Sequence, residues 1–195
     1  MAVSAEIKTA GVLSSFHTAA RSGVKKACQA VSAMSASALR LYVISAGVAP
    51  TARLAEIAGD PEDLVVGVYI TVSGDIPGHA LLVFPYQSAL LLTDILLGRP
   101  PGSTAHLDEM EQSVIQELGN IVTSSYLTAL SDFYRCTLMP SPPGLAVDMA
   151  AAVIDSVLLN TGRFDEDTIN IVTKFTGPNR SLRGFFLYIP EIALE

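Results

Sequence analysis

Cysteine and histidine are scarce in this sequence, and their scarcity excludes several kinds of site. Among 195 residues there are two cysteines, Cys28 and Cys136, and three histidines. The histidines offer no metal-ligand spacing around the cysteines, which lie inside predicted helices or strands. We therefore expect both thiols to be small buried apolar groups, with neither a disulfide nor a metal site. No nucleophile–base pair or metal triad is visible either, which argues against a self-contained hydrolase.

Positive charge is also sparse. Twelve lysines and arginines stand against nineteen aspartates and glutamates, which gives a formal net charge of −7. Binding to nucleic-acid phosphates needs clustered cations, and the compact basic cluster here is the short segment Arg21–Lys26. The composition thus argues against nucleic acid as a partner. We interpret the cluster as a solvated or dimer-facing edge, and a homodimer stays an open alternative.

The sequence also lacks a segment that we would expect to enter a membrane. Glu6 and Lys8 interrupt the apolar start of the chain, so no signal peptide is predicted. The uncharged stretch Ile76–Thr93 is long, but Pro77 and Pro85 divide it into a turn, a short strand and a helix. We therefore expect a cytoplasmic protein without direct membrane insertion.

The remaining pattern indicates a globular fold with a large apolar interior. Half of the residues are hydrophobic and 16% are charged, which excludes a disordered chain. Helical periodicity and β-branched runs then follow one another twice in a similar order. The first pass predicts helices over Ser14–Leu39 and Tyr86–Leu97 and strands over Leu41–Val48, Leu64–Ser73 and His79–Phe84. The second predicts helices over Asp108–Phe133 and Met149–Leu159, an extended piece over Cys136–Val147, and strands over Thr168–Phe175 and Leu182–Ile189.

We interpret the two passes as an internal duplication. Shifting the first half by 99 positions brings most apolar positions of the two long helices into register, and Gly78–Pro85 matches Gly184–Pro190 with one residue of slippage. The sequence therefore predicts a single domain over residues 1–195, made of two fused repeats at about 10–100 and 107–190. Tight hairpins and a long helix opening each half predict an α+β fold, a pseudo-twofold arrangement of two long helices packed on antiparallel β-sheet.

A polar stripe on the second long helix is the most informative candidate site. Ser113, Glu117 and Asn120 stand at i, i+4 and i+7, so at about 100° per residue their side chains share one helix face. A solvated surface face is the alternative, because surface helices show polar residues at this spacing. A carboxylate beside a carboxamide suits holding a cation with Glu117 and orienting a water with Asn120. Gly119 indicates either close helix packing or room for another molecule's backbone.

The polar stripe is part of a longer pattern. The segment Ser113-Val-Ile-Gln-Glu117-Leu-Gly-Asn120, followed after twenty-two residues by Pro143, resembles the signature of the CheC/CheX/FliY phosphatases of bacterial and archaeal chemotaxis. The similarity covers about residues 10 to 190 and includes Tyr126–Phe133. This resemblance to CheC-like proteins implies a two-component signalling role, the dephosphorylation of the response regulator CheY. Mg²⁺ is expected on CheY, so no metal or cofactor is expected in this chain.

The resemblance also implies a role for each residue of the motif. Glu117 would pair with the CheY lysine that contacts the phosphoryl group, and Asn120 would hold a water in line with the aspartyl phosphate. Ser113 would hydrogen-bond Glu117 or the partner, with an ordinary surface serine as the alternative. Gly119 would let CheY approach closely, with helix–helix packing as the alternative. Pro143 would fix the loop beside Asn120, and its neighbour Pro142 is an equally open candidate.

The first half departs from this pattern. Its corresponding residues are Ser14, Thr18 and Arg21, and Ile44 stands where the family has proline. Threonine cannot pair with a lysine, and arginine offers only hydrogen-bond donors, so we predict that this first site is catalytically dead. The chain is then a phosphatase of phosphorylated CheY with one active site. The alternative is a non-enzymatic adaptor that binds CheD, phosphorylated CheY or both, and regulates receptor modification or signal output.

Overall fold

The computed structural model describes residues 9–35, 39–50, 59–161, 167–177 and 182–191 of the chain. The first half contains α1 (Thr9–Met34), β1 (Arg40–Pro50), β2 (Leu64–Gly74), β3 (Gly78–Pro85) and α3 (Tyr86–Leu96). The second half contains α4 (Glu109–Tyr134), β4 (Leu138–Pro140), β5 (Gly144–Met149), α5 (Ala150–Thr161), β6 (Asp167–Thr176) and β7 (Arg183–Pro190).

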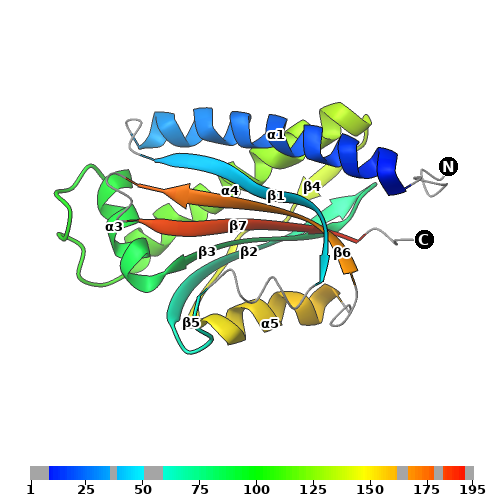
Figure 1. Ribbon diagram of the computed structural model, residues 1–195. Coiled ribbons are helices and arrows are strands. Elements are labelled where there is room, and N and C mark those ends of the chain that lie inside the picture. Colours follow the sequence, from blue (N-terminus) through cyan, green and yellow to red (C-terminus); the bar gives the residue numbers. More distant parts are fainter. Residues whose placement is uncertain (1–8, 36–38, 51–58, 162–166, 178–181, 192–195) are drawn as a thin grey trace.

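The strands form one antiparallel sheet in the order β1-β6-β7-β3-β2-β4, with β5 also paired to β2 (Figure 1). Two hairpins, β2–β3 and β6–β7, meet in the middle of the sheet, where Gly78 of β3 lies opposite Pro190 of β7. β1 extends the sheet beside β6, and β4 with β5 extends it beside β2. The pairing pattern is therefore the same in the two halves, while the duplication itself stays a prediction.

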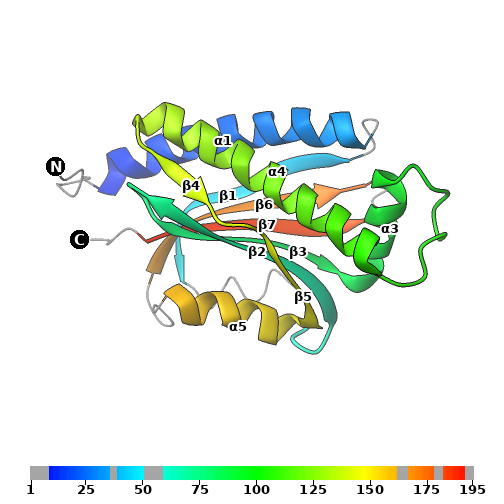
Figure 2. The same cartoon turned by 180° about the vertical axis from the view of Figure 1, so that it is seen from behind.

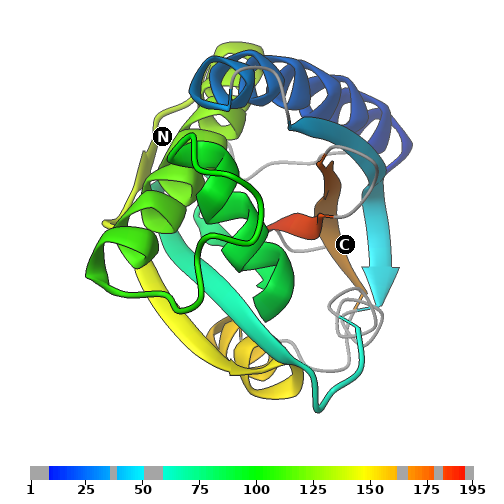
Figure 3. The same cartoon turned by 90° about the vertical axis from the view of Figure 1, so that its left-hand side faces the viewer.

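The helices cover the two faces of this sheet unequally. α1 and α4 lie side by side on one face, and α5 lies on the other (Figures 1 and 2). Viewed from the α3 end, the layers follow the strong curvature of the sheet (Figure 3). On β2, Val66 and Val68 belong to the core beneath α1 and α4, whereas Val65 belongs to the core beneath α5. The predicted α+β class, with two long helices on an antiparallel sheet, is confirmed.

A close contact holds α4 against α1 and the sheet. A Cβ at Gly23 of α1 would lie 2.5 Å from the ring of Tyr126, so the absent side chain makes room for that ring. Tyr126 is buried, its hydroxyl bonds the hydroxyl of Thr173 on β6, and its ring stacks on Phe186 of β7 with centroids 4.7 Å apart. The centre of α4 is thereby anchored to the first helix and to two strands.

The first helix begins and ends about five residues earlier than predicted. α1 ends at Met34, before the predicted Leu39, because the Ser35 hydroxyl donates to the Val31 carbonyl at 2.8 Å and accepts the Leu39 N–H at 3.3 Å. The Ser35 hydroxyl thus accepts the Leu39 N–H in place of a helical carbonyl.

Two further expectations, on the cysteines and on membrane insertion, can be compared with the structure. Cys28 and Cys136 are free and half-buried, so they are less buried than expected. The Cys28 thiol donates to the Leu41 carbonyl at 3.5 Å. Within the described ranges, no helix is long and apolar enough to cross a bilayer.

Candidate functional site

The helix that carries the polar stripe is well defined at both ends. α4 begins after the extended residue Asp108, and Glu109 and Glu111 place carboxylates in its first turn, where the helix dipole favours negative charge. It ends at Tyr134, and Arg135 follows in the left-handed conformation with φ 53°. The sequence thus specifies one long helix of 26 residues across the site.

The structure brings the three predicted polar residues together on the outer face of α4. Ser113 and Glu117 are exposed and Asn120 is half-buried, whereas the apolar residues Ile115 and Leu118 are fully buried on the inner side. In the described part of the chain, none of the three polar side chains makes a hydrogen bond or an ion pair. Their carboxylate, carboxamide and hydroxyl groups are therefore available to another molecule, and Ser113 does not hydrogen-bond Glu117.

A proline loop lies beside this face, and a glutamine holds it there. The side-chain amide of Gln116 donates to the carbonyl of Pro143 at 3.2 Å. Gln116 precedes Asn120 by four residues, so both side chains lie on the same side of the helix. Pro143 is half-buried and Pro142 is exposed, so the contact to α4 is made through Pro143. Gln116 was not among the predicted site residues, although its spacing from Asn120 was a usable signal.

The other end of the loop is attached to the sheet. The Ser141 N–H donates to the Thr71 carbonyl at 2.8 Å, and the Thr71 N–H donates to the Ser141 hydroxyl at 3.1 Å. The loop between β4 and β5 is therefore held by β2 on one side and by α4 on the other. This arrangement holds Pro143 against α4 at Gln116, one helical turn before Asn120.

The structure corrects the interpretation of Gly119. This residue is buried, and a Cβ added to it would lie 2.7 Å from Cγ1 of Val68 on β2. Gly119 therefore faces the sheet and provides neither room for a partner nor a helix–helix contact. The absent side chain lets α4 lie close to β2.

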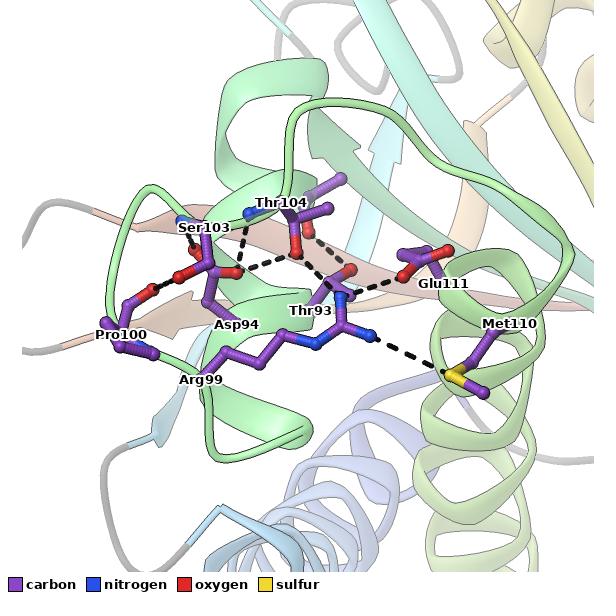
Figure 4. A network of polar contacts seen from close by, with 9 residues as sticks. Thr93, Asp94, Arg99, Pro100, Ser103, Thr104, Met110 and Glu111 are labelled. Atoms are coloured by element: carbon purple, nitrogen blue, oxygen red, sulfur yellow. Dashed lines mark hydrogen bonds and ion pairs between the residues drawn. The ribbon is translucent and has the colours of Figure 1, made fainter.

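A polar network fixes the segment that leads into α4 (Figure 4). The buried Asp94 carboxylate accepts the backbone N–H groups of Gly102, Ser103 and Thr104 at 2.6, 3.1 and 2.9 Å, and the Thr104 hydroxyl at 2.6 Å. Burial by itself raises the pKa of Asp94, but the bonds from Thr104, Gly102 and Ser103 outweigh it, so the pKa lies below its ordinary value. The charged carboxylate thus holds the loop after α3 in place.

Arg99 joins this loop to the first turn of the site helix. Its guanidinium donates to the Glu111 carboxylate at 2.8 Å and to the Thr104 hydroxyl at 3.2 Å, as Figure 4 shows. The hydrogen bond from Arg99 lowers the pKa of Glu111, and the charge of Arg99 adds to the effect. The start of α4 is therefore tied to the rest of the fold two turns before Asn120.

The first motif has a different environment. Thr18 and Arg21 are exposed on α1, while the side chain of Ser14 lies outside the described residues. β1 runs from Arg40 to Pro50, and its register shifts between Val43 and Ser45, so Ile44 occupies a bulge. The second half instead has two short strands separated by the proline loop. Ile44, which stands where the family pattern has proline, thus lies in a strand, whereas the matching Pro143 lies in a loop.

The two long helices also carry opposite charges. The sequence of α1 contains no acidic residue, and Arg21, Lys25 and Lys26 give it positive charge. The sequence of α4 contains no basic residue, and its carboxylates include Glu117 and Asp132. Lys26 pairs with Asp132 at 2.6 Å, so this part of the basic cluster is an interhelical ion pair. A cationic group would be attracted to the α4 face and repelled by the α1 face.

Comparisons with known proteins match this segment and this fold. A model of the CheC-like family matches residues 110–147, which run from α4 to β5. The CheY-P phosphatase CheC of Bacillus subtilis (strain 168) is 29% identical over 143 residues, covering 71% of this chain and 68% of that protein. The crystal structure of Thermotoga maritima FliY aligns with a TM-score of 0.70 at 17% identity, over 95% of this chain and 92% of that one. The CheX–CheY–BeF3–Mg²⁺ complex from Borrelia burgdorferi aligns with a TM-score of 0.52 at 13% identity, over 90% and 96%.

The fold is that of the FliY and CheX structures, and residues 110–147 match the model of the CheC-like family. The matched segment contains Ser113, Glu117, Asn120 and Pro143, so the candidate site lies in the part of the chain that carries the family likeness. These matches confirm the resemblance to the CheC-like proteins found in the sequence.

Proposed function

We propose that this protein hydrolyses the aspartyl phosphate of a phosphorylated CheY-type response regulator from one site on α4. The observation that carries this proposal is the pair Glu117 and Asn120, which share an outer helix face with no partner in the described part of the chain. The pair lies in the segment matched by the CheC-like family, and a relative of this chain is a CheY-P phosphatase.

In this proposal the two side chains have separate tasks. Glu117 pairs with the ammonium group of a lysine on the regulator, which docks the two proteins. Asn120 hydrogen-bonds a water and holds it in line with the bond between phosphorus and the aspartyl oxygen. The water oxygen bonds to phosphorus as that P–O bond breaks, which leaves a free carboxylate and inorganic phosphate carrying the water's protons. Mg²⁺ is expected on the regulator, where it would neutralise charge on the phosphoryl oxygens.

Gln116 and Pro143 would act as positioning residues for this reaction. Their hydrogen bond holds the proline loop beside the half-buried Asn120. In this proposal the loop restricts the Asn120 side chain, which then loses less rotamer freedom when it binds the water, and this favours a single in-line geometry. Ser113 lies one turn before Glu117 and is available to the regulator.

The same reasoning proposes a single active site for each chain. Thr18 offers no carboxylate for a lysine, and Arg21 offers no acceptor for a water. β1 also continues past the position where the second half forms its loop. The loss of catalytic groups from an exposed helix is the observation that favours the second candidate function, an adaptor that binds CheD or phosphorylated CheY. A homodimer is a separate possibility that either function allows.

The decay of phosphorylated CheY, measured with and without this protein in the presence of Mg²⁺, tests the proposed function. We expect wild-type protein to accelerate the decay, and Asn120→Ala and Glu117→Ala each to remove the acceleration, by about a hundredfold or more for Asn120. Thr18→Ala and Arg21→Ala are the matched controls on α1 and should retain wild-type rates. Equal rates for the wild type and Asn120→Ala would exclude the proposed chemistry.

A further inference from the structure

An exposed apolar strip runs along the edge of the sheet next to the candidate site. Leu64 of β2 and Val147 and Met149 of β5 are 48%, 40% and 50% exposed, which is unusual for side chains of this kind on adjoining strands. Leu64 lies directly opposite Met149, and Val147 lies opposite Val66. These three residues, called the β5 strip below, therefore form one continuous surface.

The β5 strip lies on the same face of the sheet as α4. Along β2, Leu64 alternates in phase with Val66 and Val68, and both valines belong to the core beneath α1 and α4. Leu145 of β5 lies opposite Val68 and packs against that core. Val147 and Met149 continue the same face beyond the edge of the core, where no helix covers them in the described part of the chain.

The strip is continuous with the site. Gly119 of α4 rests on Val68 of β2, and Val68 lies opposite Leu145 of β5. A single residue of β2 therefore separates the site helix from β5. Val147 and Met149 lie about 7 and 13 Å further along the strand, at about 3.3 Å per residue. A protein interface of standard size covers about 800 Å² on each partner, a patch about 30 Å across. A partner seated on Asn120 would therefore reach the strip.

The border of the strip carries negative charge. Asp60, Glu62 and Asp63 are exposed in the turn that precedes Leu64. This turn is fixed to the start of α5, because the N–H of Ala150 donates to the Asp63 carbonyl at 2.8 Å and another N–H donates to the Pro61 carbonyl at 3.1 Å. An apolar surface rimmed by acidic residues fits a partner whose surface is apolar at the centre and basic at its edge.

The first half matches the β5 strip only in part. The shift of 99 residues places Val48 at the position of Val147 and Pro50 at that of Met149. Val48 is 37% exposed on β1, but the long methionine side chain has no counterpart there. Tyr42 and Ile44 of β1 are also exposed, at 51% and 56%, so the β5 strip is distinguished by its place beside Glu117 and Asn120 and not by its size.

We propose that the β5 strip is a docking surface for the phosphorylated regulator, and that it binds an apolar region with basic neighbours beside the phosphorylation site. This inference rests on the proposed function and adds to it a determinant of affinity. The strip is remote from the reacting atoms, so its contacts are the same before and during the reaction. Such contacts lower KM and leave kcat unchanged.

The test separates KM from kcat in steady-state dephosphorylation. We expect the double variant Val147→Ser/Met149→Ser to raise KM by about tenfold while kcat stays within about twofold. Asn120→Ala should show the opposite pattern, with a lost kcat and retained binding to a regulator that carries BeF3 and Mg²⁺. Val48→Ser, the matched control on β1, should leave both constants unchanged. Far-UV circular dichroism and the melting temperature confirm that each variant is folded.

An unchanged KM in the folded double variant would overturn the docking proposal while leaving the proposed function intact. If Asn120→Ala keeps wild-type kcat, the proposed function fails. The docking proposal is then tested separately, by comparing the affinities of the wild type and the double variant for the BeF3-loaded regulator. Sedimentation velocity tests whether a second copy of the chain occupies the β5 strip instead. A wild-type dimer that the double variant abolishes, with regulator binding unaffected, would assign the strip to a second copy of the chain and would also overturn the proposal.

Discussion

Substitution of Gly119 by alanine tests how closely the site helix rests on the sheet. The new Cβ would lie 2.7 Å from Cγ1 and 3.1 Å from Cβ of Val68, well inside the ordinary carbon–carbon separation of about 3.5–4.0 Å. Val68 is 1% exposed and β-branched, so its side chain has little freedom to relieve the clash, and no rotamer change moves its Cβ. Overpacking of this kind costs about 1–3 kcal/mol, against a helix-propensity gain of about 1 kcal/mol for alanine over glycine.

Because these two effects oppose each other, the change in stability caused by Gly119→Ala should depend on the residue at position 68. In wild-type protein, Gly119→Ala should lower the free energy of unfolding by up to about 2 kcal/mol. In a Val68→Ala background the contact with Cγ1 is removed and only the 3.1 Å contact with Cβ remains, so the same substitution should be between neutral and stabilising by about 1 kcal/mol. Urea denaturation of the four proteins gives the coupling energy, which we expect to be about 1–3 kcal/mol. A coupling below about 0.5 kcal/mol would refute the close approach of α4 to β2.

Two further predictions concern the polar contacts around α4. The lowered pKa values of Asp94 and Glu111 mean that the unfolded chain binds protons more readily, so their stabilisation is complete above the ordinary carboxyl pKa and is lost as the pH falls through the folded values. Asp94→Asn should therefore lower the free energy of unfolding by about 2 kcal/mol near neutral pH, and this free energy should fall less steeply on acidification than in the wild type. The same acid dependence in both proteins would contradict this account. Gln116→Ala should release Pro143 and lower kcat by about tenfold with little change in melting temperature, whereas Ser113→Ala should retain most activity; equal kcat values for both variants would argue against the positioning role.

Much of the fold could be predicted because its elements bury regular patterns. The central strands contact helices on both faces, so Leu64–Gly74 and Gly78–Pro85 appear as nearly continuous apolar runs bounded by turn residues. The end of α1 was mispredicted because the Ser35 hydroxyl bonds the Val31 carbonyl and the Leu39 N–H, and hydrophobic periodicity does not record such side-chain bonds.

The site was predictable only in part. The shared face of Glu117 and Asn120 follows from helix geometry, whereas the bond from Gln116 to Pro143 joins residues 27 positions apart and depends on tertiary structure. Gly119 could have been assigned to the inner face, because it stands four residues after buried Ile115 and three before buried Val122.

The anchoring of α4 has a consequence for the energetics of partner binding. Its backbone is fixed at the first turn by Arg99, near the middle by the contact of Gly119 with Val68, and farther on by Tyr126. Association therefore orders few groups on this side beyond the side chains that meet the partner, so the conformational entropy lost on docking is small. A surface of this kind is suited to brief encounters, because little ordering precedes complex formation and little has to be undone when the partner leaves.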